Sequence, residues 1–344
     1  MDLGGQKNAS HCHLFLSPVL RHCQLPAIYS DLKCIGTRCP ALESLFLGRA
    51  IADATDELPV KLLSETVRSC KQLKYLECPP LDCASWKHLS NLTTLVTVTI
   101  SEGHDNIQLD PDNFNFAPFV NLTCLCFHMN TAAHFITIMR HLEFPSLKVF
   151  GVTAVELPLT EAEQLLHALS KCKAYQTLES IDIFCTGGLE SLEPLLQNAT
   201  RHLFCFTQLR TLELHLHSPI YLDNDLLMEA VSSWPHIRSL SFYSTPLVTF
   251  RGLFAALRLC PHLDTFAAEI DAVNIDVDPE AESFQHTSLR TLDLSYSDVE
   301  DPQAVARIIF SMLPCISEVL HWDILEWDQV DSELESLRLS VVPA

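Results

Sequence analysis

Two nine-residue stretches, QLRTLELHL at residues 208–216 and SLRTLDLSY at residues 288–296, spell nearly the same strand. Their leucines alternate with polar residues, which is the period-two pattern of a β-strand with one buried face. Leu212 and Leu292 occupy equivalent places, 80 positions apart. A phrase that recurs in register indicates a repeat protein, so we expect the rest of the chain to carry further copies.

The underlying template is L-x-x-L-x-L, with other apolar residues allowed at the leucine positions. Its first positions advance by about 26 residues on average, a step typical of leucine-rich repeats. We count thirteen copies, whose first positions are residues 20, 42, 73, 95, 122, 147, 178, 209, 237, 263, 289, 316 and 334.

Between the predicted strands, the apolar spacing changes to that of an amphipathic helix. Thr160 and Glu163 have the spacing of a capping box. Asp301 is the expected N-cap of a later helix, with Pro302 at the first helical position. Each repeat is therefore predicted as strand, loop, helix and loop. The other predicted helices cover residues 58–70, 188–200, 224–233 and 247–259.

One repeat cannot fold alone. Its three inward apolar side chains contribute about 1.5–3 kcal/mol each on burial, whereas ordering about 26 residues costs at least about 1 kcal/mol per residue. Stacked repeats share one core, so we predict an α/β leucine-rich-repeat solenoid, a right-handed horseshoe or arc with a parallel concave sheet and convex helices. We expect a single domain over residues 14–344 and a frayed terminus over residues 1–13.

The charge of the chain restricts its partners. The 43 acidic and 22 basic residues give a formal net charge of −21, which repels phosphate backbones and anionic lipids. We therefore predict no nucleic-acid partner and no membrane partner. The apolar stretches are also shorter than the roughly 20 residues that span a bilayer.

The start of the chain, MDLGGQKNASHCHLFLSPVL, lacks a basic segment followed by an uninterrupted apolar one. No secretory signal is predicted from it. The 14 cysteines are too sparse for a disulfide-stapled secreted domain. We predict a cytoplasmic or nuclear protein that is not secreted.

Short tags precede several strands and make the pattern more specific. Together with two longer segments, they resemble the leucine-rich-repeat portion of fungal F-box proteins, a large family in mushroom-forming fungi. The resemblance covers most of residues 14–340. The segments are RCPALESLFL (38–47), SCKQLKYLEC (69–78), LCPHLDTFAA (259–268), LPCISEVL (313–320), LFLSPVLRHCQLP (14–26) and CPPLDCASWKHLSNLTTLVTVTI (78–100).

The resemblance implies a role in ubiquitin ligation. In that family an N-terminal F-box binds the adaptor of a cullin-type ligase, and the repeats hold the substrate. Here only about 20 residues precede the first repeat, and they contain no L-P-x-E-[LI]-L phrase. The nearest match, LPVKLLSETV at residues 58–67, falls where a repeat needs its helix, so we predict a repeat helix. Adaptor binding is expected only if an F-box lies upstream.

The third and fifth template positions are predicted to face solvent on the concave side, because the leucines point inward. Carboxylates at the fifth position form an acidic track, which we expect to hold a basic or extended segment of a partner protein. The alternative is that these acids only keep an exposed strand face soluble. The predicted partner-binding residues are Tyr75, Glu77, Asp182, Glu213, His215, Tyr243 and Asp293.

Cys124, Cys126 and His128 alternate along one predicted strand and could approach a metal from one side. Their spacing is not C-x₂-C, and no second cluster follows at zinc-finger distance. We therefore predict an exposed strand and no metal or cofactor site. His11, Cys12 and His13 lie in the terminus predicted to be frayed, and we predict no metal site there either. We predict small buried groups at Cys39, Cys70, Cys260 and Cys315.

The sequence contains no G-x-x-x-x-G-K-[ST], G-x-G-x-x-G or G-x-S-x-G motif. We predict a non-enzymatic protein–protein interaction module, the substrate-recognition part of an F-box-like, SCF-type ubiquitin ligase subunit. One alternative is a free-standing leucine-rich-repeat scaffold or regulator that does not bind the ligase adaptor. An alternative of another class is a metal- or thiol-dependent hydrolase.

Overall fold

The computed structural model describes residues 16–25, 32, 34–48, 58–101, 109, 116–187, 197–216, 219–242, 244–321 and 325–341. The chain divides into two compact units: unit 1 comprises residues 1–178 and 185–187, and unit 2 comprises residues 179–184 and 188–344. The single domain over residues 14–344 stays a prediction. Residues 1–13, predicted to be frayed, lie outside the described residues.

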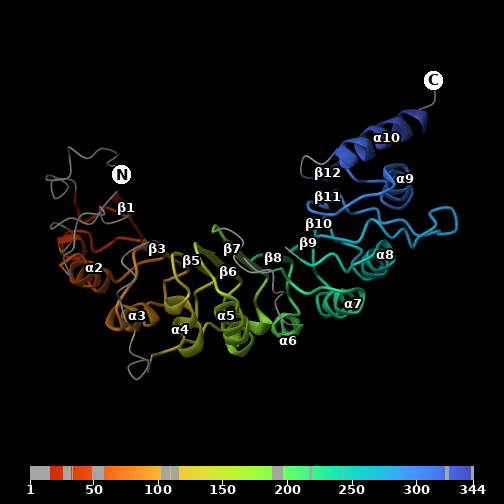
Figure 1. The fold of residues 1–344 in the computed structure, drawn as a ribbon. Helices are drawn as coiled ribbons and strands as arrows, with labels where there is room; N and C mark the ends of the chain where they lie inside the picture. The colour runs from red at the N-terminus through yellow and green to blue at the C-terminus, as the bar shows by residue number, and fades with distance from the viewer. Residues whose placement is uncertain are drawn as a thin grey trace. The chain divides into compact units, whose positions relative to one another are not determined.

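The strands of unit 1 are parallel, and neighbours in the sheet follow the order of the chain (Figure 1). All six in the described part begin at the third position of the predicted template. They are β1 (His22–Leu25), β2 (Ser44–Leu47), β3 (Tyr75–Cys78), β4 (Thr97–Ile100), β5 (Cys124–Met129) and β6 (Val149–Ala154).

The strands of unit 2 follow the same rule. Parallel strands that follow the order of the chain and repeat with the predicted spacing are typical of the leucine-rich-repeat class, so the predicted class, a leucine-rich-repeat solenoid, is confirmed. The strands are β7 (Ser180–Cys185), β8 (Thr211–His215), β9 (Ser239–Phe242), β10 (Thr265–Ala267), β11 (Thr291–Asp293) and β12 (Glu318–Leu320).

One backbone arrangement sets the register from repeat to repeat. The carbonyl oxygen of Arg21, at a second template position, accepts hydrogen bonds from Glu43 N at 2.8 Å and Ser44 N at 2.9 Å. In unit 2 the carbonyl oxygen of Arg210 accepts in the same way from the N–H groups of Arg238 and Ser239. Each strand is thereby aligned with the next, and the leucines of successive repeats stack into one buried row.

The fourth and sixth template positions form the core, as predicted. Leu212 and Leu214 of β8 are completely buried, and so are the corresponding residues Leu292 of β11 and Leu294, which directly follows β11. Burial of each such side chain contributes about 1.5–3 kcal/mol. The shared apolar row therefore supplies the main driving force that one isolated repeat lacks.

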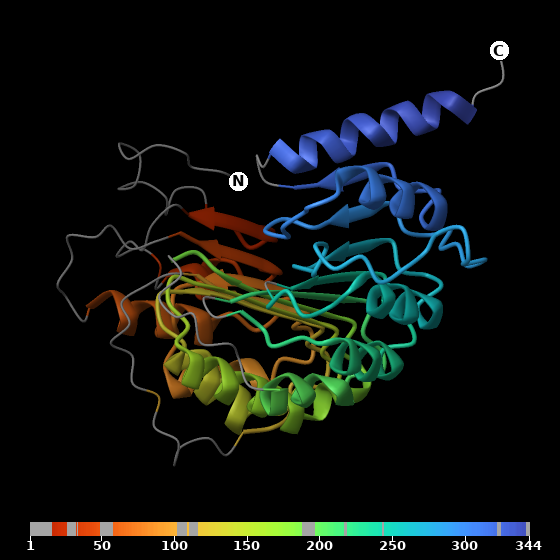
Figure 2. The ribbon, with the colours of Figure 1, turned by 45° about the vertical axis from the view of Figure 1, so that its right-hand side comes forward.

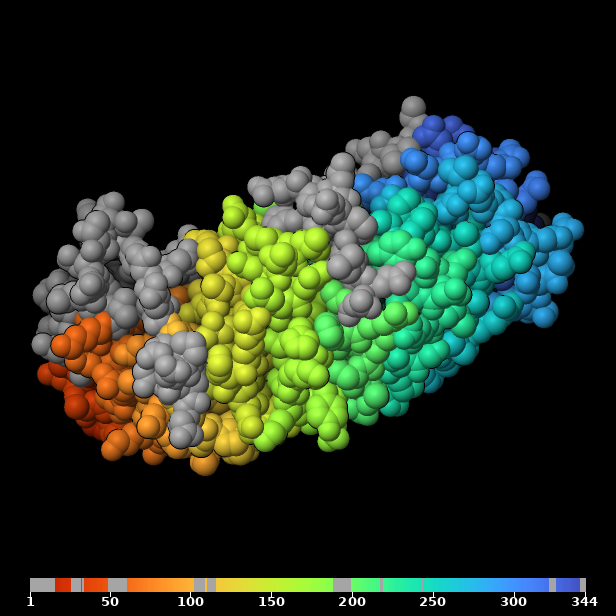
Figure 3. Space-filling view, turned by 60° about the horizontal axis from the view of Figure 1, so that its bottom comes forward, coloured from red at the N-terminus to blue at the C-terminus, as the bar shows by residue number. Residues whose placement is uncertain are grey.

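Helices cover one face of the strands within each unit, and neighbouring helices pack on one another (Figures 1 and 2). In the described part, the opposite face carries no helix, and we call it the helix-free face. Figure 3 shows successive repeats of each unit as adjoining bands. The helices are α1 (Ile35–Arg38), α2 (Leu58–Ser69), α3 (Cys83–Ser90), α4 (Ala133–His141), α5 (Leu159–Lys171), α6 (Gln197–Arg201), α7 (Asn224–Ser233), α8 (Phe250–Leu259), α9 (Pro302–Met312) and α10 (Leu325–Val341), with 3₁₀ turns η4 (Lys173–Gln176) and η5 (His202–Cys205).

Several helix predictions are confirmed. Asp301 caps α9 by accepting a hydrogen bond from Ala304 N at 3.0 Å. Helix α2 lies in the chain between β2 and β3, so residues 58–67 belong to a repeat helix. The helix predicted over 224–233 is α7. No helix among the described residues is long and apolar enough to cross a membrane.

Other helix starts differ from the prediction. The capping box of Thr160 and Glu163 is wrong, because Pro158 is the N-cap of α5 and Thr160 already lies inside the helix. Helix α8 begins at Phe250 rather than at residue 247. Thr249 is its N-cap, because the Thr249 side chain accepts a hydrogen bond from the N–H of Gly252. Of the helix predicted over 188–200, residues 188–196 lie outside the described residues.

The predicted thirteenth strand, beginning at Leu334, is wrong, because this segment belongs to α10. Trp327, Val330 and Leu334 are buried and recur at helical spacing, whereas Leu339 is 75% exposed. Helix α10 packs against α9. The template was met by chance, since a helical i, i+3 pair of leucines also satisfies L-x-x-L.

The connection between β10 and β11 also departs from the predicted repeat, because residues 268–290 form no helix. Acidic and turn-forming residues interrupt the apolar spacing there. Asp271 accepts hydrogen bonds from the backbone and side chain of Asn274, and Asp278 accepts one from Glu280 N. Such local bonds compete with helix formation.

Candidate functional site

The helix-free face of unit 1 contains two of the predicted partner-binding residues. Tyr75 and Glu77 alternate on β3; Tyr75 is 44% exposed and Glu77 is half-buried. Glu77 is the register partner of Phe46 on β2 and of Thr99 on β4. An exposed aromatic ring therefore lies beside one carboxylate, and the acidic track does not extend to the neighbouring strands.

Two predicted carboxylates lie side by side in unit 2. Asp182 on β7 and Glu213 on β8 are register partners, on strands about 4.8 Å apart. Asp182 is exposed and Glu213 is half-buried. Two negative charges at this separation favour a cationic group placed between them.

Asp293 lies apart from this pair. Starting from Glu213, the register runs through Ser241 and Ala267 before it reaches Asp293, three strands and about 14 Å away. The Asp293 carboxylate accepts a hydrogen bond from Ser295 N at 2.9 Å, which stabilises the turn after β11. The binding role of Asp293 stays a prediction, but the acidic track is interrupted by two neutral positions.

His215 occupies a mixed aromatic and polar environment. Its Nε2 lies 3.2 Å from Ser241 Oγ, and its ring centroid lies 5.6 Å from that of Phe184, the register partner of His215. The imidazole covers Ser241, which explains why this fifth-position residue is buried. Tyr243, the remaining predicted binding residue, lies outside the described residues.

The rule that third and fifth positions face solvent fails at two serines. Ser44 and Ser241 are both less than a tenth exposed. A histidine of the preceding repeat covers each of them, and His22 Nδ1 lies 2.9 Å from Ser44 Oγ. Burial at these positions follows from the neighbouring side chain, which the template does not consider.

Charged residues at the second template position pair across the strands. Glu43 lies between Arg21 and Lys74, with ion pairs of 2.6 and 2.8 Å. The hydrogen bond from Lys74 holds the pKa of Glu43 below its usual range, and Arg21 acts in the same direction. In unit 2, Glu179 pairs with Arg210 at 3.6 Å. The predicted binding surface does not include these residues, although their opposite charges at the same template position could have predicted the pairing.

Cys124 and Cys126, predicted to lie on an exposed strand without a metal site, are close together. The Sγ atoms of Cys124 and Cys126 are 3.8 Å apart on β5, and both residues are half-buried. The hydrogen bond from Cys126 lowers the pKa of Cys124 to about 7, against the opposing effect of burial. In the part of the chain that the structure describes, no group of three or more His, Cys, Asp or Glu could hold a metal.

The cysteines that precede strands behave as predicted in most repeats. Cys39, Cys70 and Cys260 are buried, and Cys315 is half-buried. Burial raises the pKa of Cys70 to about 12 and that of Cys260 to about 11. Cys70 and Cys260 therefore remain protonated, and the buried cysteines serve as small core groups.

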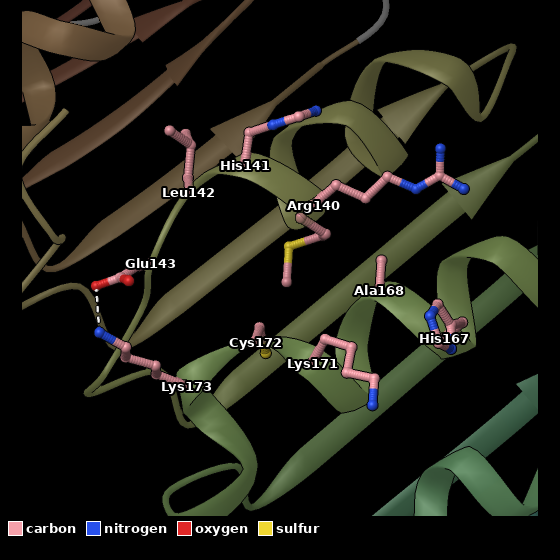
Figure 4. A pocket seen from close by; sticks show the side chains of 10 residues that line it. Arg140, His141, Leu142, Glu143, His167, Ala168, Lys171, Cys172 and Lys173 are labelled. Carbon is pink, nitrogen blue, oxygen red and sulfur yellow. Dashed lines mark hydrogen bonds and ion pairs between the residues drawn. The ribbon is translucent and has the colours of Figure 1, made fainter. Parts of the chain in front are cut away.

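A hollow of about 560 Å³ lies on the helix side of unit 1, at the C-terminal ends of α4 and α5. Figure 4 shows Lys173 reaching Glu143, with which it forms a 2.7 Å ion pair, and Lys171 pointing away from that pair. Arg140 donates a hydrogen bond to Gln164. Cations are favoured at helix C-termini, so the basic lining is explained by the fold.

No family model matches the chain, and the search of curated proteins found no match. Among solved structures, an internalin (inlF) from Listeria monocytogenes is similar, with a TM-score of 0.40, 15% identity, and coverage of 87% of this chain and 64% of that chain. A leucine-rich repeat protein from Bacteroides eggerthii is also similar, with a TM-score of 0.40, 13% identity, and coverage of 78% and 51%.

The chain spans less than two thirds of the length of either solved structure. Similarity at this level carries no argument about function. The class of the protein, a leucine-rich-repeat solenoid, rests on the parallel strand order and the repeated register described above.

Proposed function

We propose that the protein is a non-enzymatic protein–protein interaction module whose helix-free face holds a basic or extended segment of a partner. The observation that carries this proposal is the neighbouring pair Asp182 and Glu213, held in register on parallel strands. A lysine or arginine of the partner would lie between the two carboxylates. Attraction between these carboxylates and a basic segment would also increase the rate at which the partner associates with the protein.

Exposed aromatic rings beside the carboxylates support the same function. Phe184 is 44% exposed and follows Asp182 at the next outward position of β7. In unit 1, Tyr75 precedes Glu77 by two residues on β3, so this ring and carboxylate also lie at adjacent outward positions. An aromatic ring can cover the aliphatic stem of lysine or arginine and attract its charge. Each unit therefore offers an aromatic and acidic pair suited to a basic side chain.

A direct binding measurement tests this function. An unstructured lysine-rich peptide is expected to bind the full chain, and the affinity should fall as salt concentration rises, because exposed charges are screened. A glutamate-rich peptide of the same length serves as the control. Equal binding of the two peptides, or no binding of the lysine-rich one, would contradict the proposal.

The more specific proposal follows the family resemblance: the protein is the substrate-recognition part of an F-box-like, SCF-type ubiquitin ligase subunit. Because residues 58–67 form a repeat helix, binding to the ligase adaptor must involve another segment. Pull-down of the chain with the purified adaptor tests this role. Failure to associate, under conditions in which an F-box protein binds, favours a free-standing scaffold or regulator.

A further inference from the structure

Two thiols lie together on the helix-free face of unit 1, apart from the residues proposed to hold a partner. Cys124 and Cys126 are alternate residues of β5, so their side chains project to the same side. Their Sγ atoms are 3.8 Å apart. A disulfide bond is only about 2.05 Å long, so the two sulfurs are in nonbonded contact, close enough for both to bind one atom placed beside them.

Closing a disulfide between these residues would distort the sheet. A disulfide needs Cβ atoms about 3.5–4.5 Å apart, whereas alternate residues of a strand lie about 6.6 Å apart. Strand β5 pairs with β4 on one side and β6 on the other, so it cannot shorten without losing ladder hydrogen bonds. The geometry therefore favours one atom bound by both sulfurs over a sulfur–sulfur bond.

The surroundings leave the sulfurs accessible. Gly151 is the register partner of Cys126, and a Cβ at Gly151 would lie 3.1 Å from Cys126 Sγ. The glycine thus keeps the space beside this sulfur open. Both thiols lose their protons when they bind a soft metal, because the thiolate is the form that coordinates it.

We propose that Cys124 and Cys126 form a two-sulfur binding site for a soft, thiophilic cation of the monovalent copper type. Thiolates select Cu(I) and Zn²⁺. Zinc sites take four ligands, and the described residues supply no cluster of three. Copper in the monovalent state is satisfied by two thiolates. Binding forms two Cu–S bonds and releases the protons still held by the sulfurs to solvent, and copper keeps its oxidation state.

This site does not rest on the proposed function. It is tested by anaerobic titration of the reduced full chain with Cu(I) held by a chromophoric chelator. The wild type should withdraw one more copper ion per chain than Cys124→Ser or Cys126→Ser. Cys315→Ser removes a half-buried thiol outside the pair and should match the wild type.

Thermal unfolding provides a second readout, because a ligand that binds only the folded state raises its stability. Without copper, all four proteins should unfold at similar temperatures. With saturating Cu(I), the midpoint should rise in the wild type and in Cys315→Ser but not in the other two variants. Equal copper uptake in all four proteins, or an equal rise in their midpoints, would overturn the proposal.

Discussion

Asp182 and Glu213 are register partners on β7 and β8, and one position farther along, Ile183 and Leu214 are register partners that are both buried. The period-two alternation of the strand therefore separates the outward side chains, which can meet a partner, from the inward ones, which hold the repeats together. Substitutions on the two sides should have different effects.

Leu212→Ala tests the inward side. Leu212 is completely buried, so its truncation should lower the free energy of unfolding by about 2–5 kcal/mol through lost burial and a cavity. Thr211→Ala, at the adjacent outward position, should change it by about 0.5 kcal/mol or less. Chemical denaturation measures both. Similar stability of the two variants would contradict the assigned faces.

Gly252→Ala tests a close contact between α7 and α8. An added Cβ would overlap the side-chain oxygen of Asn224, which accepts a hydrogen bond from Thr249 N at 3.0 Å. The gain in helix propensity is about 1 kcal/mol, whereas displacing Asn224 costs about 1–3 kcal/mol. We expect net destabilisation in thermal unfolding, reduced when Asn224→Ala is added. If Gly252→Ala were instead more stable than the wild type, Asn224 would have to move aside at little cost, which would contradict the close contact.

Trp327→Ala tests the role of α10 at the end of unit 2. The Trp327 ring is completely buried, and its Nε1 donates a hydrogen bond to the Ser297 carbonyl at 2.8 Å. Its removal should cost about 3–5 kcal/mol. Leu339→Ala should have almost no effect in the same denaturation experiment, because Leu339 is largely exposed. A large loss in Leu339→Ala would instead support the strand first predicted there.

Glu269 should make stability depend on pH. Burial, and then the neighbouring Asp298 carboxylate, raise the pKa of Glu269 from 4.5 to about 7. The folded chain therefore holds this proton more tightly than the unfolded chain. The contribution of this tighter proton binding to the free energy of unfolding is fully present below pH 4.5 and is lost as the pH rises through about 7.

Glu269→Gln removes this titration. The variant should unfold at a higher temperature than the wild type above pH 7, and the difference should disappear below pH 4.5. Glu280→Gln changes an exposed carboxylate of the nearby loop and serves as the control. The same difference between wild type and Glu269→Gln at all pH values would contradict the assigned cause.

Much of the fold could be predicted from the sequence, because inward leucines at period two determine where strands begin. The template failed at Leu334, where L-x-x-L also fits a helix and Trp327 and Val330 complete the helical spacing. It also failed over residues 268–290, where local hydrogen bonds of Asp271 and Asp278 replace a helix. In both segments, side-chain interactions outside the template decide the structure.

The candidate site could be predicted only in part. The alternation placed Asp182 and Glu213 on one face, and the neutral residues Ser241 and Ala267 at the same template position could have predicted the gap before Asp293. The burial of Ser241 beneath His215 depends on side-chain conformation, which a repeat pattern does not specify. The same holds for the close approach of the two thiols on β5.

Asp182 and Glu213 are the carboxylates proposed to bind the basic segment of a partner. Because a net charge of −21 attracts cations everywhere, the location must be tested with charge-matched variants. The control is Glu280→Lys/Glu300→Lys, which changes two exposed carboxylates outside the strands by the same total charge as Asp182→Lys/Glu213→Lys.

The decisive measurement is the affinity of the lysine-rich peptide for the wild type and these two double variants at one salt concentration. We predict that Asp182→Lys/Glu213→Lys binds about ten-fold more weakly than the control variant, a difference of about 1.4 kcal/mol. Equal affinities of the two double variants would show that net charge alone attracts the peptide and would contradict the assigned surface.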